Sequence, residues 1–159
     1  MAAIVGGVLR AVASFAPSVL RSDIELQLLY FVVDVFLLLG VLGFYELRHD
    51  DIGRTGAVGF LVALVGLAVV RSSRAIPGVD LYPVGALAFA GGLLTLCVGA
   101  WRVQALAAWV PAALLASILA GLVGTSVEGA GWLFVLSGVA FGVAFVGLGL
   151  EVWSAARRL

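Results

Sequence analysis

The stretch that decides the fold runs from Glu25 to Leu47 and reads ELQLLYFVVDVFLLLGVLGFYEL. An α-helix of this length measures roughly 33 Å, at about 1.5 Å per residue, and the hydrocarbon core of a bilayer is about 30 Å thick. One acidic residue, Asp34, lies well inside the apolar run. The stretch therefore predicts a transmembrane helix that carries a polar group into the membrane.

Asp34 shares a helix face with other polar side chains, because successive residues turn by about 100°. This polar stripe consists of Gln27, Tyr30, Asp34 and Tyr45. A charged group at the bilayer centre costs about 2.5–3.5 kcal/mol on insertion scales, so the stripe is expected to face other helices.

The sequence allows two interpretations of Asp34. It is a proton relay, ion site or ligand anchor, or it makes an interhelical hydrogen bond that fixes packing. No second carboxylate and no arginine is expected at its depth. The expected hydrogen-bond partners are Tyr30, Tyr45 and three hydroxyl groups placed away from the ends of their spans: Thr95, Ser117 and Ser137.

The composition places the rest of the chain in the membrane as well. Of 159 residues, 64 % are hydrophobic, against about 45–50 % in soluble domains. The formal net charge is zero, which argues against nucleic acid as a partner. All the basic residues are arginine, and with the abundant alanine and glycine this predicts a prokaryotic source with a GC-rich genome.

The apolar segments predict an all-α, polytopic membrane protein, a bundle of five transmembrane helices. Residues 1–22 are expected to form an amphipathic helix in the membrane interface, because Arg10 and Ser14 oppose a wide apolar face. Residues 23–159 are expected to form the bundle. The five predicted spans are 25–47, 55–71, 81–101, 105–124 and 131–153.

Glycines recur at helical spacing in the third and fifth predicted spans. Small residues let two helix backbones approach closely, so these faces are expected to pack against another helix of this chain or of a partner. The predicted packing residues are Gly85, Gly92, Gly99, Gly131, Gly138, Gly142 and Gly149.

Residue clusters that carry catalysis or bind metal are not found in the sequence. His49, Asp50 and Asp51 follow the first span, where they form a solvated turn, a pH-sensitive contact or a weak metal site. Cys97 lies alone in an apolar run, as a small buried hydrophobe does. We therefore expect no enzyme activity, no metal and no cofactor other than bound lipid.

The orientation follows from the arginines. In the five-span topology, four arginines lie on the membrane face that holds the N-terminus and five lie on the opposite face. The loop with Glu128 has no arginine and lies on the first side, which favours an N-terminus outside and a C-terminus inside. The expected location is the inner cell membrane.

The first hairpin also resembles a known group of proteins. Gly40 to Tyr45 reads GVLGFY, and Arg54 to Gly66 reads RTGAVGFLVALVG. Over residues 26–70 this is similar to small multi-span bacterial membrane proteins of unknown function. The resemblance implies a packed helix hairpin and no activity.

Two functions are expected from these patterns. The first is a structural or accessory subunit that packs against itself or a larger membrane protein through Gly/Ala-rich helix faces, with lipid around it. The alternative is a small carrier, proton-coupled channel or apolar-ligand-binding protein that uses the polar stripe around Asp34.

Overall fold

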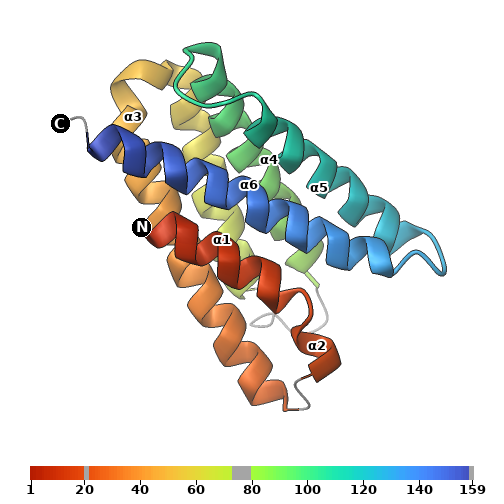
Figure 1. Cartoon of the computed structure of the whole chain (residues 1–159). Helices are drawn as coiled ribbons and strands as arrows, with labels where there is room; N and C mark the ends of the chain where they lie inside the picture. Colours follow the sequence, from red (N-terminus) through yellow and green to blue (C-terminus); the bar gives the residue numbers. More distant parts are fainter. Residues whose placement is uncertain (20–21, 73–79, 158–159) are drawn as a thin grey trace. The chain divides into compact units, whose positions relative to one another are not determined.

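The computed structural model describes residues 1–19, 22–72 and 80–157. Every regular element in these ranges is a helix. The elements, labelled in Figure 1, are α1 (Ala2–Ala13), α2 (Ala16–Val19), α3 (Asp23–Ser72), α4 (Tyr82–Arg102), α5 (Trp109–Ser126) and α6 (Trp132–Ala156). The all-α prediction is confirmed.

Four of these helices, α3 to α6, are long and apolar enough to cross a membrane. Many large apolar side chains on them are exposed, Leu61 and Trp132 among them. A soluble protein of this size does not expose so much apolar surface, because water penalises it by about 25 cal/mol per Å². These features indicate a membrane protein with a helical core.

The first two predicted spans are joined in the single 50-residue helix α3, which has one non-helical residue, Gly53. Its φ of 56° and ψ of −154° lie in a region that glycine enters without steric penalty. The chain thus breaks between the arms 23–52 and 54–72. The first arm runs five residues past the predicted end at Leu47, so residues 48–51, which were expected to form a turn, are helical.

The chain divides into two compact units. The first unit contains Met1–Phe44 and Ala108–Leu159, and the second contains Tyr45–Ala107. The predicted division, by contrast, separates residues 1–22 from residues 23–159. In the structure α1 belongs to the first unit, together with α5 and α6.

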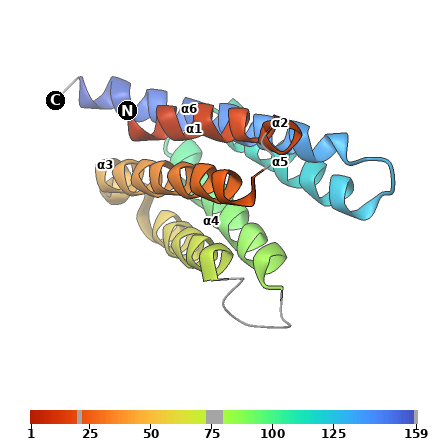
Figure 2. The same ribbon diagram turned by 90° about the horizontal axis from the view of Figure 1, so that it is seen from below.

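Within the first unit, α1 packs lengthwise against α6 (Figures 1 and 2). A methyl group on Gly149 would lie 2.7 Å from the backbone nitrogen of Ile4. One on Gly142 would lie 2.5 Å from the carbonyl oxygen of Gly7. The later residue of α6 faces the earlier residue of α1, so the two helices are antiparallel. The short distances show that their backbones nearly touch.

The first arm of α3 lies on another side of α1. A methyl group on Gly6 would lie 3.0 Å from the carbonyl carbon of Phe36, and one on Gly40 would lie 2.8 Å from the Cβ of Ala3. Gly40 also faces the ring of Phe145 in α6. Helix α1 therefore contacts both α3 and α6, and it runs antiparallel to each of them.

A reciprocal pair of hydrogen bonds joins α5 to α6. The Ser117 hydroxyl donates to the carbonyl oxygen of Ser137 at 2.8 Å, and the Ser137 hydroxyl donates to that of Ser117 at 2.8 Å. Gly121 lies next to this pair and leaves room for the Ser137 side chain. Hydroxyl groups satisfied in this way can be buried among apolar helices at little cost.

In the second unit, α4 packs on the second arm of α3. A methyl group on Gly85 would lie 2.7 Å from the Val70 nitrogen, and one on Gly59 would lie 2.5 Å from the Leu96 nitrogen. Gly92 meets the backbone of Ala63. Small residues on both helices thus bring the two backbones together, as packing in a bilayer requires.

The link from α4 to α5 is longer than the three residues 102–104 that the sequence suggests. Gln104 has a φ of 58°, its N–H donates to the Trp101 carbonyl, and the Ala105 N–H donates to that of Ala100. These two bonds form a Schellman motif, which ends α4. Helix α5 begins at Trp109 and not at residue 105, and Pro111 then falls in its first turn, where no N–H is needed.

Candidate functional site

Tyr30 and Asp34 occupy one side of the first arm of α3, since residues four apart share a helix face. Both side chains are half-buried. The Tyr30 hydroxyl donates a hydrogen bond to the carbonyl oxygen of Ala13, the last residue of α1, at 3.3 Å. Asp34 also takes part in an interaction. This part of the predicted polar stripe therefore contacts the interior of the first unit.

The other two members of the polar stripe are placed differently. Gln27 is exposed. The Tyr45 ring stacks on Phe60, with 4.0 Å between ring centroids and an interplanar angle of 6°. Because this contact closes over the break at Gly53, it holds the two arms of α3 together in the second unit. The four residues do not act as one continuous stripe.

Helix α1 supplies two polar side chains that the sequence analysis assigned to a water-facing surface. The Ser14 hydroxyl donates to the carbonyl oxygen of Arg10 at 3.1 Å, and the Arg10 guanidinium donates to the Ser14 oxygen at 3.5 Å. Both lie against Gly138 of α6, where the Ser14 hydroxyl fills the space that a side chain would take. Gly138 is thus needed to seat these polar groups.

The contacts between α1 and α3 show which residues of the two helices lie side by side, and so fix the level of Arg10 along the helix axis. Gly6 meets the backbone of Phe36, and Ala13 meets the Tyr30 hydroxyl. Arg10 lies between Gly6 and Ala13 on one helix, and Asp34 lies between Tyr30 and Phe36 on its antiparallel neighbour. Arg10 and Asp34 are therefore at nearly the same level along the two helices.

In the structure an arginine therefore lies at nearly the level of Asp34 along the two paired helices, where none was expected. Arg10 was not expected there because a 12-residue helix is too short to be predicted as a membrane span. The polar residues at Arg10 and Ser14 were the available signal, but they fit a water-facing side equally well. Only the packing partner decides which way that side points. We name Arg10, Ser14, Tyr30 and Asp34, which lie at neighbouring levels along α1 and α3, the polar cluster.

The other hydroxyl groups expected near Asp34 are bound elsewhere. Thr95 donates to the carbonyl oxygen of Gly91 within α4, at 2.8 Å. Ser117 and Ser137 donate to each other's backbone. Thr95 is thus satisfied within its own helix, while Ser117 and Ser137 join α5 to α6.

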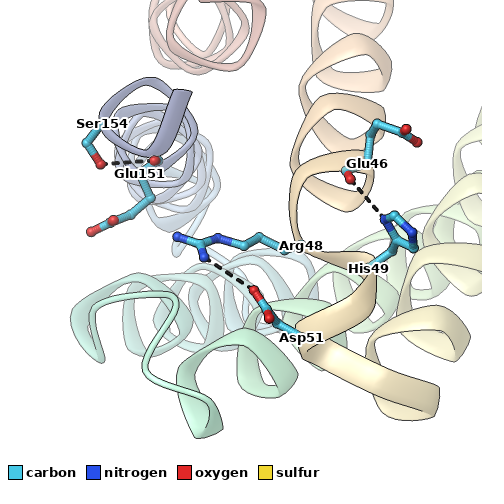
Figure 3. Close-up of polar contacts among 6 residues, drawn as sticks. All are labelled: Glu46, Arg48, His49, Asp51, Glu151 and Ser154. Carbon is cyan, nitrogen blue, oxygen red and sulfur yellow. Dashed lines mark hydrogen bonds and ion pairs between the residues drawn. The ribbon is translucent and has the colours of Figure 1, made fainter. Parts of the chain in front are cut away.

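The polar segment before Gly53 forms local contacts, which Figure 3 shows in close-up. Arg48 pairs with Asp51 at 3.3 Å, and the His49 Nδ1–H donates to the carbonyl oxygen of Glu46 at 2.9 Å. The His49 Nε2 lies 3.2 Å from the Asp50 carboxylate. The bond to Glu46, and then the charge of Asp50, raise the pKa of His49. This segment is the polar end of the first arm, at the end of the predicted span 25–47, and it belongs to the second unit.

Among the described residues, no three His, Cys, Asp or Glu side chains gather as metal ligands would. Cys97 is free and buried in α4. At the end of α6, the Ser154 hydroxyl donates to the carbonyl oxygen of Glu151 at 3.0 Å, a bond within one helix turn (Figure 3). The polar cluster remains the candidate site.

The glycines named from the sequence fall into three groups. Those of α4 face the second arm of α3, and those in the interior of α6 face α1, while Gly131, just before α6, has no neighbour within 4 Å of an added methyl group. The first group is Gly85, Gly92 and Gly99, and the second is Gly138, Gly142 and Gly149. Both sets of interior glycines are used within their own unit.

Comparison with known proteins adds no assignment. No protein-family model matches the chain, and searches of curated proteins and of solved structures give no match. The resemblance of residues 26–70 to small bacterial membrane proteins stays a prediction. The polar cluster and the helix packing are therefore the features that bear on function.

Proposed function

We propose that the protein is a small membrane carrier or channel for protons, in which the Asp34 carboxyl group takes up and releases the proton. The observation that carries this proposal is the level of Arg10, which lies beside that of Asp34 on an adjacent, antiparallel helix. Ionisable groups inside a membrane segment are costly, and they mark ion pathways and proton relays.

Of the four residues in the polar cluster, Arg10 supplies a constant charge and Asp34 supplies the group that exchanges a proton. Arg10 keeps its charge at physiological pH, so it supplies a constant positive potential at this level. Asp34 has a carboxyl group that holds or loses one proton. The Tyr30 and Ser14 hydroxyl groups already donate to backbone carbonyls of α1, which leaves their oxygens free to accept hydrogen bonds, as the Ser14 oxygen does from Arg10.

The packing of the glycines also supports this choice over the accessory-subunit alternative. That function was expected from Gly/Ala-rich helix faces, and its glycine faces must be available to a partner. Gly142 and Gly149 are occupied by α1, and Gly92 is occupied by α3. A partner cannot use these faces while the chain keeps its own packing.

The test is proton flux into liposomes that contain the purified protein and a pH-sensitive dye, driven by a potassium diffusion potential. The native chain should carry protons, and Asp34→Asn should abolish the flux while leaving the helical circular dichroism spectrum and its melting unchanged. The matched control is Asp23→Asn, which changes an exposed carboxylate at the start of the same helix and should keep the flux.

Flux no faster than in empty liposomes would overturn the proposal, and so would full activity of Asp34→Asn. Loss of flux together with loss of helix melting would point to a structural role for Asp34. In that case Asp34→Glu, which keeps a titrating carboxyl group, separates the two roles. Recovery of both the fold and the flux would support proton exchange. Recovery of the fold without the flux would mean that proton exchange is not the function.

A second function is favoured by the outward surface of α5. Ala112 and Ala116 are exposed, next to the exposed side chains of Leu115 and Leu119. Such a surface suits an accessory subunit that packs against a second copy, because alanines permit a close helix contact. Ala116→Cys should then give a disulfide-linked dimer in native membranes. The control Val143→Cys, on an exposed position of α6, should not.

A further inference from the structure

The direction of α1 bears on the topology of the chain. Its contacts with α6 run from Ile4 opposite Gly149 to Ser14 opposite Gly138. Eleven residues of α6 correspond to about 16 Å along the helix axis. We propose that residues 1–22 form a sixth, broken membrane crossing, which places the N-terminus on the same membrane face as the C-terminus.

The first argument is the alignment of the two helices. Helix α6, Trp132–Ala156, is 25 residues long and is one of the candidate spans. A helix that follows a transmembrane helix lengthwise for about 16 Å shares its direction. It therefore runs across the bilayer, whereas an interfacial helix lies in the plane of the membrane surface.

The second argument is the chemistry of the exposed side of α1. Val5, Val8 and Val12 are 41 %, 50 % and 61 % exposed, and Phe15, just after the helix, is 55 % exposed. Their spacing of three and four residues puts them on one face. The polar residues of the segment point the other way, toward α6. An outward apolar face with inward polar groups is stable in lipid and costly in water.

The third argument is length. Helix α1 alone is too short to cross, but its last residue, Ala13, is at the level of Tyr30. Helix α3 begins at Asp23, seven residues earlier, or about 10 Å along its axis. The nine residues from 14 to 22, which include the short helix α2, are enough to cover this distance. The crossing is broken after Ala13, where α1 ends.

The fourth argument is the distribution of arginine. When residues 1–22 cross, Arg10 moves from a loop into the membrane. The face of the two termini then carries five arginines, and the opposite face carries three. The five are Arg48, Arg54, Arg102, Arg157 and Arg158, and the three are Arg21, Arg71 and Arg74. An excess of arginine marks the cytoplasmic side, so both termini lie inside the cell.

The beginning of α1 and the end of α6 lie close together in the first unit, as Figure 1 shows. A methyl group on Gly149 already meets Ile4, near the N-terminus. This inference does not depend on proton transport, because a six-crossing topology is compatible with either proposed function. It replaces the expectation of an external N-terminus with an internal one.

Cysteine labelling with a membrane-impermeant maleimide tests the topology. Three single substitutions are made in the otherwise native chain: Ala2→Cys, Ala156→Cys and Glu128→Cys. The native chain is the blank, because Cys97 has an exposed fraction of 0 %. Labelling is compared between right-side-out spheroplasts and inside-out vesicles, with detergent-solubilised membranes as the measure of full reactivity.

We expect positions 2 and 156 to label only in inside-out vesicles and position 128 only in spheroplasts. Labelling of position 2 together with position 128 would restore the five-crossing topology and overturn the inference. Labelling of position 2 in neither preparation, but fully in detergent, would overturn it as well, since the N-terminus would then end inside the bilayer.

Discussion

The contact between α1 and α6 is most directly tested by adding one methyl group at Gly142. The new Cβ would lie 2.5 Å from the Gly7 carbonyl oxygen and 2.9 Å from both the nitrogen and the Cβ of Ala11. Two of these three atoms belong to the backbone of α1, which cannot rotate away as a side chain can. Gly142→Ala should therefore push α1 off α6.

The magnitude follows from two opposing effects. Overpacking of a close contact costs about 1–3 kcal/mol, while replacing a helical glycine by alanine stabilises the helix by up to about 1 kcal/mol. Gly43→Ala is the matched control, because Gly43 is also helical and in the first unit, with nothing within 4 Å of the added methyl group. The propensity gain is common to both variants, so their difference, about 1–3 kcal/mol, measures the clash.

The assay is reversible unfolding in mixed micelles with increasing dodecyl sulfate, followed by far-ultraviolet circular dichroism. Gly43→Ala should be as stable as the native chain or more stable, and Gly142→Ala should be less stable than Gly43→Ala by the stated amount. Equal stability of the two alanine variants would refute the close packing of α1 on α6.

Three further predictions use the same preparation. A double-mutant cycle of Ser117→Ala and Ser137→Ala should give a coupling free energy of about 0.6 kcal/mol, at most about 1.7, and strict additivity would mean that the two hydroxyl groups do not bond across α5 and α6. Gln104→Gly should stabilise the fold by about 0.5–1 kcal/mol, because φ is 58° there and glycine removes the left-handed strain; Gln104→Ala should give no such gain, and an equal gain from alanine would contradict the explanation. His49 should titrate, by nuclear magnetic resonance, above the value of 6.5 for free histidine, since the Glu46 carbonyl and the Asp50 charge favour its protonated form. Its stabilising effect is thus full at low pH and disappears as the pH rises through the folded-state pKa. Asp50→Asn should lower the midpoint part of the way, and an unchanged midpoint would exclude the contribution of Asp50.

The sequence by itself determined where helices form and which of them are apolar. The run from Glu25 to Leu47 predicts a helix of membrane length, and α3 contains it within Asp23–Ser72. The polar residues after the first predicted span predict a break, and it falls at Gly53. These features depend on local properties, namely side-chain hydropathy and the φ that glycine permits. They can therefore be predicted without knowing which helices pack together.

Helix ends were less well predicted where the hydropathy is uniform. Residues 105–108 are as apolar as the helix that follows, yet α5 starts at Trp109. The cause is the Schellman motif around Gln104, a residue that rarely takes a positive φ. Composition does not reveal such a motif, because it depends on two backbone hydrogen bonds.

Only the tertiary structure decided which partner each helix face meets. The same pattern in α1, small residues and valines with Arg10 and Ser14, fits an interfacial helix and fits a helix packed on α6. The close approach of Gly7 to Gly142 selects the second arrangement in the structure. The contacts of Gly6 and Ala13 with α3 then bring Arg10 to the level of Asp34. The physical reason is that hydropathy distinguishes lipid from water, but in a membrane the contacts between helices depend on shape. Which glycine faces which backbone is a property of the packed pair and of neither segment alone.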